Sequence, residues 1–160
     1  MTFDPGSFRD ASARVFHDNG RVLRGLSGAA VPAWRAVSNA RFFRDGMAAG
    51  TIVGTRELTE APQTSASQGF EVVLEHDRLP FVSYPYEWTF GMLRSAALLQ
   101  LDLLEQALAE GFVLKDASAF NSQWIGPRPV FVDVSSFEPL EAGEPWAGYR
   151  QFCEMFLYPL

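Results

Sequence analysis

Residues 89–112, "TFGMLRSAALLQLDLLEQALAEGF", constrain the fold more than any other stretch of this sequence. Apolar residues recur in it at spacings of three and four, the period of one helix face. Thr89 supplies an N-cap side chain, and Gly111 suits the residue that follows a helix. Additional leucines lie around the helix, so we expect it to be central and mostly buried. The repeating residues are Leu93, Ala97, Leu101, Leu104 and Leu108.

The sequence before this helix is dominated by strand patterns. Residues 13–26 hold two β-like runs around an Asn-Gly pair, which favours a tight hairpin turn. Residues 29–50 carry a helical apolar stripe, and residues 51–60 look extended. Residues 70–88 predict a strand, a turn, a second extended piece and a connector into the long helix.

The sequence after the helix predicts a loop, a hairpin that turns at Gly126, and an apolar tail over residues 146–160. The tail ends in the middle of an apolar pattern, which predicts a fragment of a longer protein. We expect this tail to form an interface, either with a further C-terminal domain or with a second copy of the chain. The apolar residues that carry this expectation are Phe152, Phe156, Leu157 and Leu160.

Composition limits the classes of function. A chain of 160 residues with 48% hydrophobic residues can bury one domain core. A net charge of −6 argues against a nucleic-acid partner, and no apolar run is long enough to predict a membrane span. We therefore expect a cytoplasmic protein. Cys153 is alone and the two histidines are too few for a zinc site, so His17 and His76 are predicted to be structural or solvent-facing.

Residues 114–134, "LKDASAFNSQWIGPRPVFVDV", hold three side chains with the chemistry of phosphate handling. Phosphoryl transfer needs a carboxylate that orients the acceptor hydroxyl and oxygen ligands that hold Mg²⁺. Asp116 lies in the loop after the long helix, Asn121 follows five residues later, and Asp133 follows the predicted hairpin. The alternative is that Asp116 and Asn121 only cap turns, as such residues commonly do.

This pattern resembles the catalytic loop and metal-binding aspartate of the protein-kinase-like fold, which includes the aminoglycoside phosphotransferases. The resemblance implies that Asp116 is catalytic and that Asn121 and Asp133 bind Mg²⁺ of an ATP complex. Residues 83–88, "SYPYEW", resemble the hinge between kinase lobes. The resemblance therefore also implies cofactor-binding roles for Lys115, Glu87 and Trp88, although these aromatics and this lysine equally suit a core contact and a surface ion pair.

The sequence departs from the kinase pattern in several places. Leu114 stands where kinases have a histidine, and no glycine-rich nucleotide loop is evident. Lys115 is the only lysine of the chain, so a phosphate-binding lysine on an N-terminal strand is absent. An arginine such as Arg24 or Arg56 could supply the charge but not the geometry of that lysine. These departures predict a site that has lost phosphotransferase activity.

A second resemblance spans nearly the whole chain. The "SYPYEW" segment and the "FLYPL" ending are its most specific parts. The chain resembles the N-terminal region of bacterial class I SAM-dependent methyltransferases, some of them of the nodulation type. The resemblance implies that methyl transfer and SAM binding belong to a domain beyond Leu160.

The expected fold is α+β and protein-kinase-like, with one domain over residues 1–160. Residues 1–83 form a small β-rich part, and residues 84–160 form an incomplete helical lobe with the catalytic-type loop and hairpin. The leading function is a kinase-like module of a SAM-dependent methyltransferase, which binds Mg-nucleotide. One alternative is a non-catalytic scaffold that positions the methyltransferase or its sugar or glycan acceptor. Another is an active small-molecule phosphotransferase.

Overall fold

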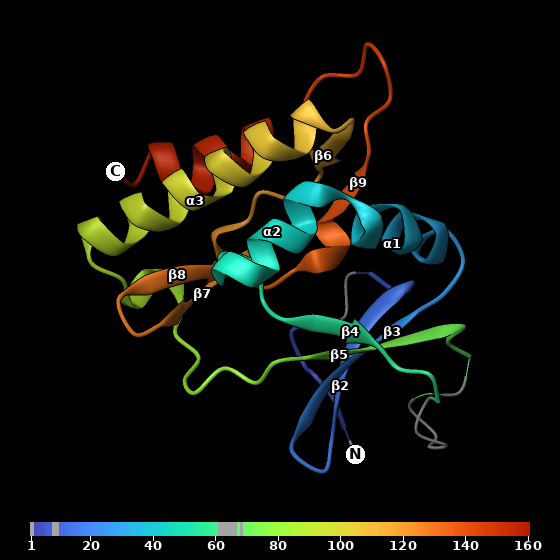
Figure 1. Cartoon of the computed structure of the whole chain (residues 1–160). Coiled ribbons are helices and arrows are strands. Elements are labelled where there is room, and N and C mark those ends of the chain that lie inside the picture. The colour runs from blue at the N-terminus through green and yellow to red at the C-terminus, as the bar shows by residue number, and fades with distance from the viewer. Residues whose placement is uncertain (1, 8–9, 61–66, 68) are drawn as a thin grey trace.

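The computed structural model describes residues 2–7, 10–60, 67 and 69–160. The described residues form a mixed α+β fold with a five-stranded antiparallel sheet and four α-helices. In Figure 1 the helices α1 and α2 lie between this sheet and the long helix α3. The sheet has the order β1-β2-β3-β5-β4 and is built from β1 (Thr2–Phe3), β2 (Ala13–Asp18), β3 (Arg21–Leu26), β4 (Thr55–Glu57) and β5 (Val72–His76).

The hairpin of β2 and β3 confirms the prediction for residues 13–26. Asn19 and Gly20 both have positive φ angles, 48° and 79°, as a type I′ turn requires. The strands pair in register from Ala13 opposite Leu26 to Asp18 opposite Arg21. Because β3 also pairs with β5, its side chains lie at the centre of the sheet.

The helical stripe predicted over residues 29–50 is confirmed, but it is divided between two helices. Helix α1 (Ala30–Asn39) ends before Ala40, whose ψ angle of 145° is extended, and α2 (Arg41–Ala49) follows. The Glu110 carboxylate accepts hydrogen bonds from the backbone nitrogens of Arg41 and Phe42 at 2.8 and 2.7 Å. A carboxylate that follows α3 thus caps the start of α2 and stabilises the break.

Helix α3 (Phe90–Ala109) has the predicted ends. The Thr89 hydroxyl accepts a hydrogen bond from Met92 N at 3.3 Å, and Gly111 has a φ angle of 79°. The predicted apolar stripe is partly wrong, because Leu101 and Leu108 are exposed. The inner face keeps Ala97 and Leu104 of that stripe and adds further leucines, alanines and a buried glutamine. The buried residues are Ala96, Ala97, Leu99, Gln100, Leu103, Leu104 and Ala107.

Two short strand pairs follow α3. The predicted hairpin at Gly126 is confirmed as β7 (Ser122–Ile125) and β8 (Arg128–Phe131), and β6 (Phe112–Leu114) pairs with β9 (Phe137–Pro139). Single 3₁₀ turns precede and follow these strands, namely η1 (Pro85–Glu87), η2 (Ala119–Asn121) and η3 (Val134–Ser136). The second extended piece predicted within residues 70–88 does not form a strand, since residues 77–84 lie outside the sheets.

The C-terminal tail packs on this chain. It forms α4 (Tyr149–Phe152) and a π-helical turn, η4 (Cys153–Leu157). Phe152 and Phe156 are buried against α3 and the loop that follows β6, in one cluster with Ala96 and Ala117. The expectation that these two rings await another domain or copy is therefore wrong, because α3 already covers them. Leu157 and Leu160 remain exposed.

One hydrophobic cluster joins the two parts of the chain. It contains Leu26 and Leu74 of the sheet, Phe43 of α2, and Leu103 and Phe137 from the second half of the chain. A backbone link reinforces it, since Phe131 N donates to Thr51 O at 2.8 Å and Val53 N donates to Phe131 O at 2.9 Å. The boundary at residue 83 stays a prediction. Among the described residues, none of the helices has the length and apolar character of a membrane span.

Candidate functional site

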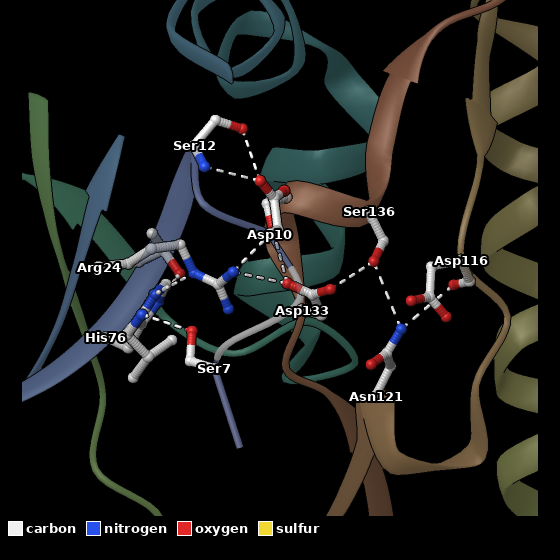
Figure 2. A network of polar contacts seen from close by, with 12 residues as sticks. Ser7, Asp10, Ser12, Arg24, His76, Asp116, Asn121, Asp133 and Ser136 are labelled. Atoms are coloured by element: carbon white, nitrogen blue, oxygen red, sulfur yellow. Dashed lines mark hydrogen bonds and ion pairs between the residues drawn. The ribbon is translucent and has the colours of Figure 1, made fainter. Parts of the chain in front are cut away.

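Figure 2 shows a polar network where the central strand β3 meets the segments that follow β6 and β8. It joins Arg24 of the sheet to all three residues that the sequence predicts for phosphate handling: Asp116, Asn121 and Asp133. In the network, Asn121 lies between the two aspartates.

Asp133 is the charged centre of this network. Its Oδ1 atom lies 2.7 Å from Arg24 Nη1, and their side chains are 24% and 8% exposed. The Ser135 hydroxyl donates to Oδ1 at 2.7 Å, and the Ser136 hydroxyl donates to Oδ2 at 2.5 Å. Burial raises the pKa of Asp133, but the Arg24 charge and these hydrogen bonds outweigh it and hold the pKa below its usual value. Asp133 is therefore a carboxylate with a fixed partner on each oxygen.

Arg24 is held from behind by a second set of contacts. Its Nε donates to His76 Nε2 at 3.3 Å, and His76 Nδ1 lies 2.9 Å from Thr55 Oγ1. The Thr55 hydroxyl donates to Val53 O at 3.0 Å, so His76 Nδ1 carries the hydrogen and donates to Thr55. Burial and the Arg24 charge lower the pKa of His76 to about 3, so the ring is neutral at pH 7. Neutral His76 thus accepts a hydrogen bond that orients Arg24, and it adds no second positive charge beside the guanidinium.

The other end of the network is made of hydrogen bonds, with no ion pair among its described residues. Asn121 Nδ2 donates to the backbone oxygen of Asp116 at 3.2 Å and to Ser136 Oγ at 3.3 Å. The Asp116 carboxylate accepts from Ser118 N at 2.9 Å, two residues along the chain. This is a local turn bond of the kind that aspartate commonly makes. Asp116 is half-buried, and its side chain stabilises its own loop.

Gln100 supports this loop from α3. It is fully buried, and its Nε2 donates to Ser118 O at 2.8 Å and to Ser122 Oγ at 3.2 Å. These two acceptors flank η2, the turn that carries Asn121. A glutamine inside an apolar helical pattern is the sequence signal for this contact. His76 was missed, because no spacing links it to Arg24.

The three predicted cofactor-binding residues have other hydrogen-bond partners. Lys115 Nζ lies 3.3 Å from Glu138 Oε2, and both side chains are 40% exposed. Glu87 accepts from Tyr84 N at 2.8 Å, and Trp88 Nε1 donates to Ser83 Oγ at 2.8 Å. Glu87 and Trp88 thus stabilise the turn before α3. Their roles toward a nucleotide stay predictions.

The residues just before β2 lie on one side of the network. Figure 2 shows Asp10 and Ser12 beside Arg24 and Asp133. Asp10 Oδ1 accepts from Ser12 N at 2.8 Å and from Ser12 Oγ at 2.6 Å. Both residues line a small cleft together with Lys115, Ser135 and others. Arg56, the other candidate arginine, pairs with Glu75 at 2.9 Å instead.

As arranged, these residues do not fit a Mg²⁺ ion. Mg²⁺ requires oxygen ligands in a near-octahedral shell. Arg24 and two serine hydroxyls occupy the Asp133 oxygens, and Asn121 turns its amide nitrogen toward the network. In the described part of the chain, no cluster of three or more His, Cys, Asp and Glu side chains could hold a metal ion. The metal roles of Asn121 and Asp133 stay predictions.

Comparison with known proteins gives one informative similarity. No protein family that was searched matches the chain. The chain is 41% identical over 155 residues to nodulation protein NoeA of Rhizobium meliloti (strain 1021). The similarity covers 97% of the chain and 32% of that protein, so the chain spans about a third of the length of this curated relative. This similarity agrees with the nodulation-type part of the resemblance and with the expectation that the chain is a fragment of a larger protein.

Proposed function

We propose that this chain is a protein-kinase-like module of a nodulation-type protein, with a nucleotide-phosphate site at Arg24 and without phosphotransferase activity. The observation that carries the proposal is the 2.7 Å pair of Arg24 and Asp133, with Asn121 and Asp116 linked behind it. Methyl transfer and SAM binding are assigned to the part of the larger protein outside this chain.

The order of the elements supports the kinase-like assignment. Kinases carry the phosphate-binding lysine on the third strand, and Arg24 lies on β3. Kinases also place an Asp-x₄-Asn loop before a metal-binding aspartate, as in Asp116, Asn121 and Asp133. In this chain the β7–β8 hairpin joins the two metal-type positions, and α3 precedes the loop.

The contacts around Arg24 and Asp116 support the loss of phosphotransferase activity. In active kinases the third-strand lysine pairs with a glutamate of the following helix. Helices α1 and α2 contain no glutamate, and their Asp45 pairs with Arg41 at an exposed position. Asp116 uses its carboxylate within its own loop, which leaves it poorly arranged to orient an acceptor hydroxyl.

Titration calorimetry of the chain with ATP tests this proposal. We expect saturable binding and no transfer of phosphate to water or to sugar acceptors. Arg24→Lys should weaken binding at least about tenfold, because lysine lacks the planar fork that reaches His76 and Asp133 together. Arg56→Lys is the matched control and should leave the affinity unchanged. Absence of binding at millimolar ATP would contradict the proposed nucleotide site.

A non-catalytic scaffold is the second candidate, and a specific surface favours it. The segment before α3 exposes Phe81 and Tyr86, and the first residue of α3 exposes Phe90; these side chains are 69%, 77% and 64% exposed. Exposed aromatic residues at this density are typical of an interaction surface. A scaffold would position the methyltransferase or a sugar or glycan acceptor. Serine substitutions at these three positions should then weaken association with the remaining two-thirds of the protein without changing ATP binding.

A further inference from the structure

We infer that the Arg24 guanidinium takes the place of a divalent cation at Asp133, so that the site excludes metal. Nucleotide binding, which rests on the proposed function, would then be independent of Mg²⁺.

The contacts of Asp133 carry the first step. The Arg24 Nη1 atom, 2.7 Å from Oδ1, stands on the side of the carboxylate that faces the sheet. The Ser135 hydroxyl accepts from the same Arg24 Nη1 atom at 2.6 Å and donates to Oδ1, and the Ser136 hydroxyl donates to Oδ2. A metal ion would have to displace at least one of these donors and would then lie beside a cation.

Arg24 has no alternative position at low cost. Its side chain is 8% exposed, and its backbone is paired on both sides, opposite Val15 and Leu74. His76 holds Nε from behind. Displaced from Asp133, the guanidinium would be a buried charge without its carboxylate, which is strongly unfavourable. The pair therefore resists opening by a metal ion.

The groups around Asp133, as arranged, do not supply a set of free oxygen ligands for a metal ion. Asp10 adds a second carboxylate beside the network, but its Oδ1 already accepts two hydrogen bonds from Ser12. Asn121 directs its amide nitrogen at Ser136. The positive charge at this position therefore belongs to Arg24, whose Nε and Nη1 already donate to His76 and Asp133. A phosphate oxygen would share this guanidinium with them.

Mn²⁺ binding to the full chain, measured by the loss of the free-ion EPR signal, tests the exclusion of metal. We expect no saturable binding to the wild type below about 1 mM Mn²⁺. Arg24→Gln should gain a saturable site, and the double variant Arg24→Gln/Asp133→Asn should lose it. Saturable wild-type binding that Asp133→Asn abolishes would overturn the inference, as would a folded Arg24→Gln variant without a site. Should Arg24→Gln not fold, the wild-type arm decides alone.

ATP titrations in Mg²⁺ and in EDTA separate this inference from the proposed function. ATP dissociation constants that differ by less than about threefold between the two buffers support both the nucleotide site and its independence of Mg²⁺. Binding at least about tenfold tighter in Mg²⁺ would overturn the inference and leave the nucleotide site standing. Absence of binding in both buffers would contradict the proposed nucleotide site. The Mn²⁺ experiment would then decide whether the site excludes metal.

Discussion

The two ends of the polar network are built on different principles. At one end, Arg24 and Asp133 come from opposite halves of the chain and form a buried ion pair. At the other end, the half-buried residues Asp116 and Asn121 are five residues apart and are joined by one neutral hydrogen bond to a backbone oxygen. The pattern that stands out in the sequence is the local one. The contact that fixes the site is the distant one.

Burial explains why the distant contact matters more. Removal of one partner from a buried ion pair leaves a charge that water reaches poorly, and this costs several kcal/mol. A neutral loop bond that is lost near the surface is largely replaced by water. Variants that destabilise the two ends equally would therefore contradict this difference.

Arg24→Met should lower the free energy of unfolding by about 3 kcal/mol, because Asp133 loses its only ion-pair partner among the described residues. Urea denaturation of the purified chain measures this. Arg56→Met is the control: Arg56 is 65% exposed and Glu75 keeps its pair with Arg21 at 2.6 Å, so the loss should be less than about 0.5 kcal/mol. Equal losses for the two variants would contradict the distinction between buried and exposed arginines.

His76 should make stability fall on acidification. Its pKa is about 3 in the folded state against about 6.5 when unfolded, so only the unfolded chain takes up the proton between these values. Stability is thus lost as the pH falls below about 6.5, by about 2 kcal/mol between pH 7 and pH 5. Arg24 and Asp133 are the charged groups beside the ring, and the lowered pKa of Asp133 keeps this carboxylate ionised in this range. His76→Gln should remove this part of the pH dependence in parallel urea titrations.

Asp116→Ala should lower the free energy of unfolding by about 1 kcal/mol, because the Ser118 backbone nitrogen loses its acceptor. Asp116→Asn keeps an acceptor oxygen at the same place and should cost less than about 0.5 kcal/mol. Thermal and urea denaturation compare the two variants. A loss for Asp116→Ala as large as that for Arg24→Met would show that the loop end of the network is the stronger one.

Lys115→Met should change stability by less than about 0.5 kcal/mol, because its pair with Glu138 is exposed at both ends. The same variant tests the nucleotide role of this lysine. An unchanged affinity for ATP, measured by calorimetry, would assign Lys115 to the surface, whereas weaker binding would bring it into the site.

The sequence predicts best where local chemistry decides the structure. The Asn19-Gly20 turn, the Thr89 cap and the hairpin at Gly126 follow from residues next to one another. The break at Ala40 does not, because it depends on Glu110 from another helix. The inner face of α3 was also missed, since buried Gln100 and its loop acceptors outweigh the leucine spacing.

The candidate site divides in the same way. Spacing alone identifies Asp116, Asn121 and Asp133 as a group, and all three belong to one network. Lack of a second lysine points to an arginine, but only the tertiary structure selects Arg24 over Arg56. His76 and the two serines beside Asp133 have no signal in the sequence, because sheet pairing and a 3₁₀ turn bring them there.

A double-mutant cycle on Arg24 and Asp133 tests the central claim most directly. The free energy of unfolding is measured by urea denaturation for the wild type, Arg24→Met, Asp133→Ala and the double variant. Residues that form one buried pair should show a coupling of about 2 kcal/mol, so that the second substitution costs far less once the first is present. Losses that add to within about 0.5 kcal/mol would contradict the claim that this pair fixes the site.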